Sequence, residues 1–300
     1  MRYAVTGGAG FIGSNLVQAI VRAGDEAIVI DNFAAVKRED RIVAEARYVE
    51  ADITDAKYQW KDLDGVDVLI HLAALPRVQY SMSNPIETMT VNVVGTSRAL
   101  VAAREHSVGR FVFAASSSAY GDHGDVPLRE DMAAQPQSPY ALQKYFGEQL
   151  CRMWNSLYGM QTVSLRFFSV YGPLLDPLGD YALVIGKFLT QKRGGVPLTV
   201  TGDGEQSRDF THVSDVVRAI LLASKSKNVG NGEIINIGAG RSVSINALAS
   251  MFQVPSVHIE PRKEPRHTLA DVSLARRLLG WEPIVRIEDG LKELLKLNSI

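Results

Sequence analysis

The chain has 300 residues, enough to bury a large core and to form a second, smaller lobe. Its 46% hydrophobic and 22% charged residues exclude wholesale disorder, collagen-like repeats and a bundle of membrane helices. Because 32 Lys and Arg residues balance 33 Asp and Glu residues, the net charge of −1 provides no positive field for a polyanion. We therefore expect no nucleic-acid partner.

The cysteine and histidine content limits the disulfides and metal sites that the chain can form. The single cysteine, Cys151, has no partner for an intrachain disulfide, and the six histidines show no spacing typical of a zinc site. We expect a reducing compartment and no metal. No apolar signal core follows Met1, and no later apolar stretch is long enough to cross a bilayer. These features predict a cytoplasmic protein without a membrane partner.

The first thirty residues predict a strand, a helix and a second strand. Apolar runs at 3–5 and 27–30 flank a helical pattern in which Ile12, Leu16 and Ile20 recur every four residues. Gly24 lies where a helix C-terminal cap is expected. Further strand-like runs alternate with helical patterns at 91–105 and 140–157; these runs are 47–49, 66–72, 109–115 and 162–168. The alternation predicts an α/β fold with a doubly wound, Rossmann-type parallel sheet.

After residue 170, glycine and proline clusters indicate loops and a change of organisation. We expect residues 1–170 to form a dinucleotide-binding Rossmann domain, to which residues 208–240 return with a helix and a strand. Residues 171–207 and 241–300 would form a smaller, substrate-binding lobe at the C-terminal side.

A glycine pattern between the first strand and the first helix predicts a dinucleotide site. It reads Gly7-x-x-Gly10-x-x-Gly13, a variant of the more frequent G-x-G-x-x-G spacing. Glycines let the backbone approach a pyrophosphate, and the free N–H groups at the helix start stabilise its charge. A plain glycine-rich turn is the alternative, and the flanking strand and helix favour the dinucleotide site.

Asp31, at the end of the second strand, indicates which cofactor is bound. A carboxylate there accepts hydrogen bonds from an adenosine ribose and repels a 2′-phosphate, so the sequence favours NAD over NADP. Lys37 and Arg38 follow closely and are able to pair with a 2′-phosphate, which leaves NADP as the alternative.

Tyr140 and Lys144 are four residues apart at the start of a helical pattern, so they face the same side. A nearby ammonium stabilises a phenolate and is expected to lower the pKa of Tyr140 toward that of a general base. Taken alone, the Tyr140–Lys144 spacing fits an ordinary contact on a helix surface equally well. Three hydroxyls, Ser116, Ser117 and Ser118, leave the end of a buried strand, where ligands bind in open parallel sheets. An ordinary polar turn is the alternative there.

Taken together, these motifs resemble the extended short-chain dehydrogenase/reductase family, in particular its nucleotide-sugar 4-epimerases such as UDP-glucose 4-epimerases. Other segments that match in order are His71-Leu72-Ala73-Ala74, Asn92 to Thr96, Ser138-Pro139-Tyr140, Leu165 to Pro173, Arg208 to Val213, Arg266 to Asp271 and Leu279-Gly280-Trp281. The resemblance covers nearly the whole chain.

The resemblance implies roles for individual residues. Ser116 would be the catalytic serine, with Ser117 as the close alternative; Tyr140 would be the base, and Lys144 would adjust the pKa of Tyr140 and bind the nicotinamide ribose. The implied NAD-binding residues are Gly7, Gly10, Phe11, Ile12, Gly13, Asp31, Asn32, Asp52, Ile53, Leu72, Ala73, Ala74, Asn92, Tyr140 and Lys144. The implied UDP-sugar-binding residues are Ser116, Ser117, Tyr140, Ser169, Arg208, Arg262 and Arg266.

Two departures from the family pattern concern the substrate. Ser169 stands where the family commonly has an asparagine that bonds the sugar nucleotide. The loop before Arg266 is one residue shorter than usual, which leaves Arg262 and Arg266 as rival ligands of the diphosphate. At the family's pocket-gating position, Thr268 is small, so we expect room for an N-acetyl group on the sugar.

The residues that follow Ser116 select a reaction within the family. Dehydratases carry an Asp-Glu pair at positions 117 and 118, and decarboxylases carry a Glu at the second position, whereas this chain has serines. We therefore expect NAD-dependent epimerisation of a UDP-hexose at C4 through a 4-keto intermediate. A nucleotide-sugar 4-ketoreductase using NAD(P)H and a non-catalytic NAD-binding scaffold are the alternatives. The resemblance also implies a homodimer joined through the 91 and 140 helices.

Overall fold

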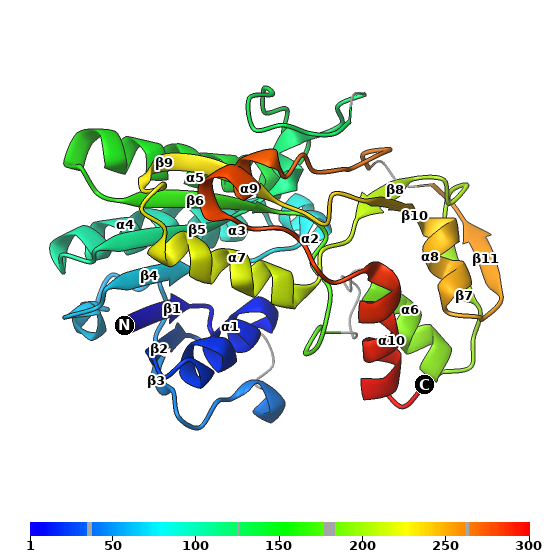
Figure 1. The fold of residues 1–300 in the computed structure, drawn as a ribbon, viewed down its shortest axis with the longest axis horizontal. Helices are drawn as coiled ribbons and strands as arrows, with labels where there is room; N and C mark the ends of the chain where they lie inside the picture. Colours follow the sequence, from blue (N-terminus) through cyan, green and yellow to red (C-terminus); the bar gives the residue numbers. More distant parts are fainter. Residues whose placement is uncertain (35–37, 125, 177–183, 262–263) are drawn as a thin grey trace.

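The fold is described by a computed structural model that covers residues 1–34, 38–124, 126–176, 184–261 and 264–300. Within these residues, seven strands form one parallel sheet in the order β3-β2-β1-β4-β5-β6-β9 (Figure 1). The strands are β1 (Arg2–Thr6), β2 (Glu26–Asp31), β3 (Arg47–Glu50), β4 (Val68–His71), β5 (Arg110–Ser116), β6 (Thr162–Phe167) and β9 (Asn231–Ile237). The predicted Rossmann-type parallel sheet is confirmed.

Helices cover both faces of this sheet because neighbouring strand residues point to opposite sides. Val5 of β1 packs with Leu16 and Ile20 on one face, whereas Ala4 packs with the α4 side on the other. Helices α1 (Phe11–Arg22), α7 (Val213–Lys225) and α9 (Ser273–Leu279) cover the first face, and α4 (Thr96–Glu105) and α5 (Pro139–Tyr158) cover the second.

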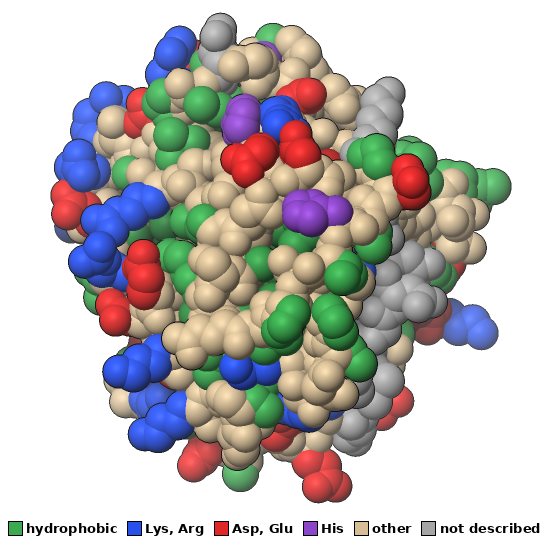
Figure 2. Space-filling view, turned by 90° about the vertical axis from the view of Figure 1, so that its right-hand side faces the viewer, with side chains coloured by type: hydrophobic (Ala, Val, Ile, Leu, Met, Phe, Trp, Pro, Cys, Tyr) green, Lys and Arg blue, Asp and Glu red, His purple; other side chains and the backbone are tan. Residues whose placement is uncertain are grey.

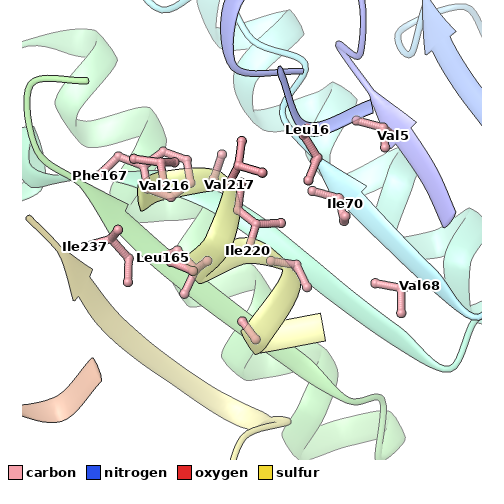
Figure 3. Close-up of a cluster of buried hydrophobic side chains, with 14 of the residues drawn as sticks. Val5, Leu16, Val68, Ile70, Leu165, Phe167, Val216, Val217, Ile220 and Ile237 are labelled. Atoms are coloured by element: carbon pink, nitrogen blue, oxygen red, sulfur yellow. The ribbon is translucent and has the colours of Figure 1, made fainter. Parts of the chain in front are cut away.

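Helix α7 lies across the middle of the first face. In Figure 3, Val216, Val217 and Ile220 of α7 point toward Leu165 of β6 and Ile237 of β9. All of these side chains are buried. The segment after residue 207 therefore returns to the main sheet, as its apolar patterns indicate, and anchors β9 at the sheet's edge.

A smaller group of elements lies at the C-terminal side of the sheet (Figure 1). It contains α6 (Val184–Arg193), α8 (Ile245–Met251) and α10 (Ile287–Leu297), the parallel pair β7 (Leu198–Thr201) and β11 (Ser256–Ile259), and the antiparallel pair β8 (Ser207–Asp209) and β10 (Ser242–Ser244). Its own core includes Phe188, Leu248, Phe252 and Leu291. Helix α6 and strands β7 and β11 have no counterpart in the sequence prediction, because glycine and proline flank them closely.

The stretch at 91–105, predicted as one helix, consists of two helical segments of different type. A π-helical turn, η3 (Thr90–Gly95), leads into α4, and the short helices α2 (Val78–Ser83) and α3 (Pro85–Met89) precede it. The remaining short helical turns are η1 (Glu39–Arg41), η2 (Lys61–Leu63) and η4 (Ser117–Tyr120). Among the described residues, no helix is long and apolar enough to span a membrane, and no cluster of three metal-binding side chains occurs.

Candidate active site

The glycine turn between β1 and α1 has the geometry of a dinucleotide cradle. Gly7 has a φ of +70°, and a Cβ there would lie 2.7 Å from the backbone nitrogen of Ala73. A Cβ on Gly13 would collide with the carbonyl oxygen of Gly7. Gly10 caps α1 without a side-chain hydrogen bond, and no acidic residue occupies the first turn. The N–H groups of that turn are therefore available to a pyrophosphate, and these residues fit NAD.

Asp31 and Asp52, which are expected to lie beside the adenosine of the cofactor, are both held by hydrogen bonds. Asp31 accepts hydrogen bonds from the backbone N–H groups of Ala9 at 3.0 Å and Phe33 at 2.8 Å, so it supports the glycine turn. Asp52 accepts one from the Asn32 amide at 2.9 Å. Each carboxylate oxygen has a second lone pair, which leaves Asp31 able to accept from a ribose hydroxyl.

Of the two basic residues considered for a 2′-phosphate, Arg38 is bound to other groups. Arg38 forms an ion pair with Asp40, with contacts of 2.6 and 3.0 Å, and donates to the carbonyl oxygen of Leu175 at 3.4 Å. Lys37 lies outside the described residues.

Asn92 fixes the segment that follows β4. Its amide accepts from the N–H of Leu75 at 2.8 Å, and donates to the Leu75 carbonyl at 3.1 Å and to Gln143 of α5 at 2.8 Å. These bonds hold residues 72–75 between the glycine turn and α5. The π-helical turn gives Asn92 this position, as such turns often do at functional sites.

Ser116 and Tyr140 meet at the carboxyl end of β5. Ser116 is the last residue of β5, and Tyr140 is in the first turn of α5, where its backbone N–H donates to the hydroxyl of Ser81 at 3.1 Å. The two side chains lie near each other, since Ser116 acts to lower the pKa of Tyr140. Ser116 also accepts a hydrogen bond from the Ser118 hydroxyl at 2.8 Å. The result is a chain of hydroxyl groups that ends at Tyr140.

Lys144 lies behind this pair and is almost fully buried. Its ammonium donates to the carbonyl oxygen of Ala114 at 2.8 Å and lies 5.0 Å from the centre of the Phe113 ring. Burial lowers the pKa of Lys144 to about 8, although Glu148 acts to raise it. A buried amine with such a pKa is typical of functional sites.

The expected lowering of the pKa of Tyr140 by Lys144 is wrong for this structure. The pKa of Tyr140 is raised because packing removes water from its hydroxyl, while Ser116 and the charge of Arg77 act in the opposite direction. The ammonium of Lys144 is instead bound to Ala114. The serine and an arginine, rather than the lysine, are the groups that favour the phenolate here.

Two of the arginines implied in diphosphate binding, Arg208 and Arg266, lie in the smaller lobe and are paired with carboxylates. Arg208 donates to Glu264 at 2.7 Å, and Arg266 makes two hydrogen bonds to Asp203 at 2.8 and 2.9 Å. Arg262 lies outside the described residues.

A cavity of about 820 Å³ adjoins these pairs. It is lined by Thr201, Gly202, Asp203, Gln206, His258, Ile259, Glu260, Pro261, Glu264 and Arg266. Figure 2 faces this side of the molecule, where histidine side chains lie close to acidic ones. The cavity is large enough for a nucleotide portion of a substrate, and its lining does not include Tyr140.

Asp209 joins the segments around this lobe. Its buried carboxylate accepts from the backbone N–H groups of Ala239 at 2.5 Å, Gly240 at 3.0 Å and Ala270 at 3.0 Å. The N–H of Asp209 donates to the hydroxyl of Thr268 at 3.3 Å, so the Thr268 side chain lies against β8.

Ser169 has a φ of +22° and its carbonyl oxygen accepts from the N–H of Thr211.

Sequence reasoning missed Ser81 and Arg77, which support or influence Tyr140, and Gln143, which binds Asn92. Ser81 and Arg77 come from the α2 segment, whose short helix has no strong apolar period. Gln143 is completely buried, yet a glutamine beside Lys144 on a helix gives no signal of burial.

A parallel sheet with a glycine cradle after β1 and a Tyr–Lys helix beside β5 is the architecture of an NAD-dependent enzyme. The model of the NAD dependent epimerase/dehydratase family matches residues 3–238. The chain belongs to this family, and its resemblance to the extended short-chain dehydrogenases/reductases is confirmed.

Individual relatives support this assignment over the whole chain. A putative UDP-glucose 4-epimerase of Methanocaldococcus jannaschii is 36% identical, with 97% of this chain and 96% of the relative aligned. The UDP-glucose 4-epimerase of Thermotoga maritima, solved with UDP-glucose, has a TM-score of 0.94 at 34% identity over 99% of this chain and 98% of that one. The UDP-glucuronic acid 4-epimerase of Bacillus cereus, solved with its UDP-sugar and NAD, has a TM-score of 0.91 at 32% identity over 100% and 99%. These findings support an NAD-dependent UDP-sugar 4-epimerase.

Proposed function

We propose that this enzyme epimerises a UDP-hexose at C4 and keeps its NAD between turnovers. The observation that carries the proposal is the close approach of Ser116 and Tyr140 at the carboxyl end of β5, with Lys144 buried behind them. This arrangement supplies one base and one hydroxyl relay. It fits a reaction that needs a single proton and a returned hydride.

In this mechanism Tyr140 removes the proton of the sugar's 4-hydroxyl, while Ser116 holds that oxygen and relays the proton. Bound NAD supplies the acceptor and later the donor of the C4 hydride. The 4-keto sugar then turns its other face toward the cofactor, and Tyr140 returns the proton to the new 4-hydroxyl. Ser118 donates to Ser116 at 2.8 Å and so directs the Ser116 hydroxyl toward Tyr140.

We propose that the smaller lobe binds the UDP portion. Residues 1–170 and 208–240 would bind NAD, and residues 171–207 and 241–300 would bind the nucleotide sugar. Arg208 would bind the diphosphate together with Arg262 or Arg266, since guanidinium groups match phosphate oxygens. Glu264 and Asp203 have to release Arg208 and Arg266 for this to occur.

Relatives differ in the sugar that they use, since UDP-glucose and UDP-glucuronic acid occur in their solved complexes. We propose UDP-glucose and UDP-galactose as the basic substrate pair. Thr268 is small and is held against β8, which supports room for an N-acetyl group at C2.

Retention of the cofactor is supported by three hydrogen bonds to the loop at 173–175, which together form a clasp at the edge of the cradle. Asn15 of α1 donates to the carbonyl oxygen of Pro173 at 3.0 Å, and Arg41 donates to that of Leu174 at 2.7 Å. Arg38 donates to the next carbonyl, of Leu175. Helix α1 and the segment of Arg38 and Arg41, which border the dinucleotide cradle, thus bind three successive carbonyl groups of the loop at 173–175. This loop would therefore close over NAD.

We also propose a homodimer in which two copies pack through α4 and α5. On α5, Leu142, Phe146, Met153 and Leu157 are exposed along one side, and Val94 and Val101 are exposed on the η3–α4 segment. Their spacing of four and seven residues forms an apolar stripe suited to a four-helix bundle. Phe146→Asp should give a monomer in sedimentation velocity, whereas a wild-type monomer would contradict the dimer.

The reaction is tested by incubating the purified protein with UDP-galactose, without added NAD, and following UDP-glucose by NMR. We expect conversion with no net NADH absorbance and no stimulation by NADPH. Stoichiometric consumption of NADPH with a UDP-4-keto sugar, while UDP-galactose is untouched, would show a ketoreductase instead. The absence of turnover with any UDP-hexose or its 4-keto form would show a non-catalytic NAD-binding protein.

A further inference from the structure

Three distant segments of the chain meet at one buried side-chain amide. Asn236, the residue before the end of β9, is completely buried, and so is Tyr120, the last residue of the turn η4. The Asn236 side-chain oxygen accepts a hydrogen bond from the Tyr120 hydroxyl at 2.8 Å. The Asn236 side-chain nitrogen donates to the carbonyl oxygens of Leu128 at 2.8 Å and of Asp271 at 3.3 Å. Both donor hydrogens of this amide are therefore used.

One of these segments belongs to the proposed sugar-nucleotide site. Leu128 and Ala270 form a parallel β-bridge. In it, the N–H of Leu128 donates to the carbonyl oxygen of Leu269 at 2.7 Å, and the N–H of Asp271 donates to that of Leu128 at 3.0 Å. Thr268 directly precedes this bridge. Asn236 thus binds both strands of a bridge that leads to the residue expected beside the sugar.

Tyr120 connects the same amide to the proposed catalytic serine. The turn η4 starts directly after Ser116 and ends at Tyr120. The Tyr120 ring belongs to a small buried cluster with Phe168 and Leu128, and the guanidinium of Arg166 lies 4.3 Å from the centre of the ring. Packing therefore holds the ring, and the hydrogen bond to Asn236 holds its hydroxyl. Together these contacts fix the end of the turn that leaves Ser116.

The polar character of this junction indicates a role beyond stability. An amide and a hydroxyl lose their hydrogen bonds to water on burial, so an apolar pair of the same shape would stabilise the fold about as well. A fully bonded polar network, in contrast, specifies one arrangement of the segments that meet there. The arrangement specified here is that of the turn after Ser116 relative to residues 268–271.

We propose that Tyr120 and Asn236 are positioning residues of the epimerisation, which hold the turn after Ser116 at a fixed place relative to residues 268–271 of the smaller lobe. The sugar would lie between Ser116 and Thr268, so the junction would set where the 4-hydroxyl meets the Ser116 hydroxyl. The inference rests on the proposed function, because it needs Ser116 to act on the sugar. Neither Tyr120 nor Asn236 touches the sugar in this scheme.

The kinetic test is a double-mutant cycle on the NAD-loaded enzyme with UDP-galactose. Tyr120→Phe removes only the hydroxyl that binds Asn236. It should lower kcat roughly tenfold, because a small displacement of a catalytic group slows its reaction, and should leave KM and the NAD content near the wild-type values. In the Ser116→Ala background, Tyr120→Phe should have no further effect on kcat, since the group that Tyr120 positions is already absent. Equal reductions of kcat in both backgrounds would overturn the inference.

A second variant cuts the junction on its other side. Asn236→Asp keeps the oxygen that binds Tyr120 and replaces the nitrogen that binds Leu128 and Asp271 with an oxygen. Its effect on kcat should also disappear in the Ser116→Ala background. If Tyr120→Phe does not fold, this variant alone decides the cycle, and a folded Asn236→Asp with the wild-type kcat would refute the inference.

The matched control is Tyr3→Phe, because Tyr3 is as buried as Tyr120 but lies in β1 at the opposite, amino end of the sheet. This variant should keep the wild-type kcat in both backgrounds. If the Tyr120 hydroxyl were merely structural, Tyr120→Phe would lower the melting temperature and keep the wild-type kcat, which would also contradict the proposal.

Amide hydrogen exchange tests the junction independently of turnover. If the wild type does not convert UDP-galactose, the proposed function fails, and exchange in the NAD-loaded protein still measures whether the two segments are coupled. In Tyr120→Phe, the amides of Leu128 and Asp271 should exchange roughly fivefold faster or more, because the amide that holds their bridge has lost one partner. Exchange unchanged from the wild type at both positions would show that the turn and the bridge are not coupled.

Discussion

The ammonium of Lys144 donates a hydrogen bond to the carbonyl oxygen of Ala114 at 2.8 Å, which joins helix α5 to the strand that ends at Ser116. Because this contact joins the two elements, it holds Tyr140 and Ser116 near each other. The proposed chemistry depends on this preorganised geometry.

Loss of the Tyr140 hydroxyl should stop the reaction without loss of the cofactor. Tyr140→Phe should lower kcat at least about 100-fold, because a positioned acid–base group is removed. NAD released by heat and quantified enzymatically should equal that of the wild type. Tyr158→Phe is the control, since this tyrosine is exposed at the far end of the same helix. Near wild-type turnover of Tyr140→Phe would remove Tyr140 from the mechanism.

The pKa of Lys144 predicts opposite pH responses of activity and stability. Burial places this pKa at about 8, against an unfolded value of 10.5. Above pH 8 the folded protein loses this proton, and kcat should fall because the ammonium of Lys144 is expected to bind the nicotinamide ribose. Between the two values the unfolded chain binds more protons, and the contribution of Lys144 to the free energy of unfolding rises with pH. Urea unfolding at pH 7 and 9.5 measures this contribution against Lys144→Met, in which the rise should be smaller. An equal rise in both proteins would contradict it.

Arg41 should control how long NAD stays bound. Arg41 is 3% exposed, and its guanidinium donates to the Leu174 carbonyl. Arg41→Met removes this bond, so the loop at 173–175 should open more often and the variant should lose NAD during dialysis. The exposed Arg47→Met serves as the control. Equal NAD content in all three proteins after dialysis would show that the clasp does not retain the cofactor.

The order of secondary structure and the cofactor cradle could be predicted because they follow from local patterns. The glycines at 7, 10 and 13 and the apolar period of Ile12, Leu16 and Ile20 require only neighbouring residues to interpret. The parallel sheet follows from repeated alternation of such units.

The surroundings of Tyr140 could not be predicted, because they depend on contacts between distant segments. Ser81 approaches Tyr140 from 59 residues away, and Gln143 is buried against Asn92 through a π-helical turn that no periodicity signals. The predicted direction of the Tyr140 pKa shift is also wrong. The sequence places Lys144 on the same helix face as Tyr140, but it does not show that the Lys144 ammonium binds a backbone carbonyl of β5.

Thr268 should determine tolerance of an N-acetyl group. Thr268→Tyr would fill the space beside β8, so kcat/KM for UDP-N-acetylglucosamine should fall roughly tenfold or more relative to that for UDP-glucose. The conservative Thr268→Ser should keep the wild-type ratio. A wild-type enzyme that strictly rejects the N-acetylated sugars would contradict the open pocket.

In the proposed mechanism, the hydride taken from C4 returns to the same sugar. UDP-galactose labelled with deuterium at C4 is incubated with the enzyme and no added cofactor, and the UDP-glucose product is analysed by mass spectrometry and NMR. Deuterium should be fully retained at C4 of the product, with the proton on the 4-hydroxyl exchanged through Tyr140. Loss of the label from C4, or a requirement for added NADPH, would contradict this mechanism.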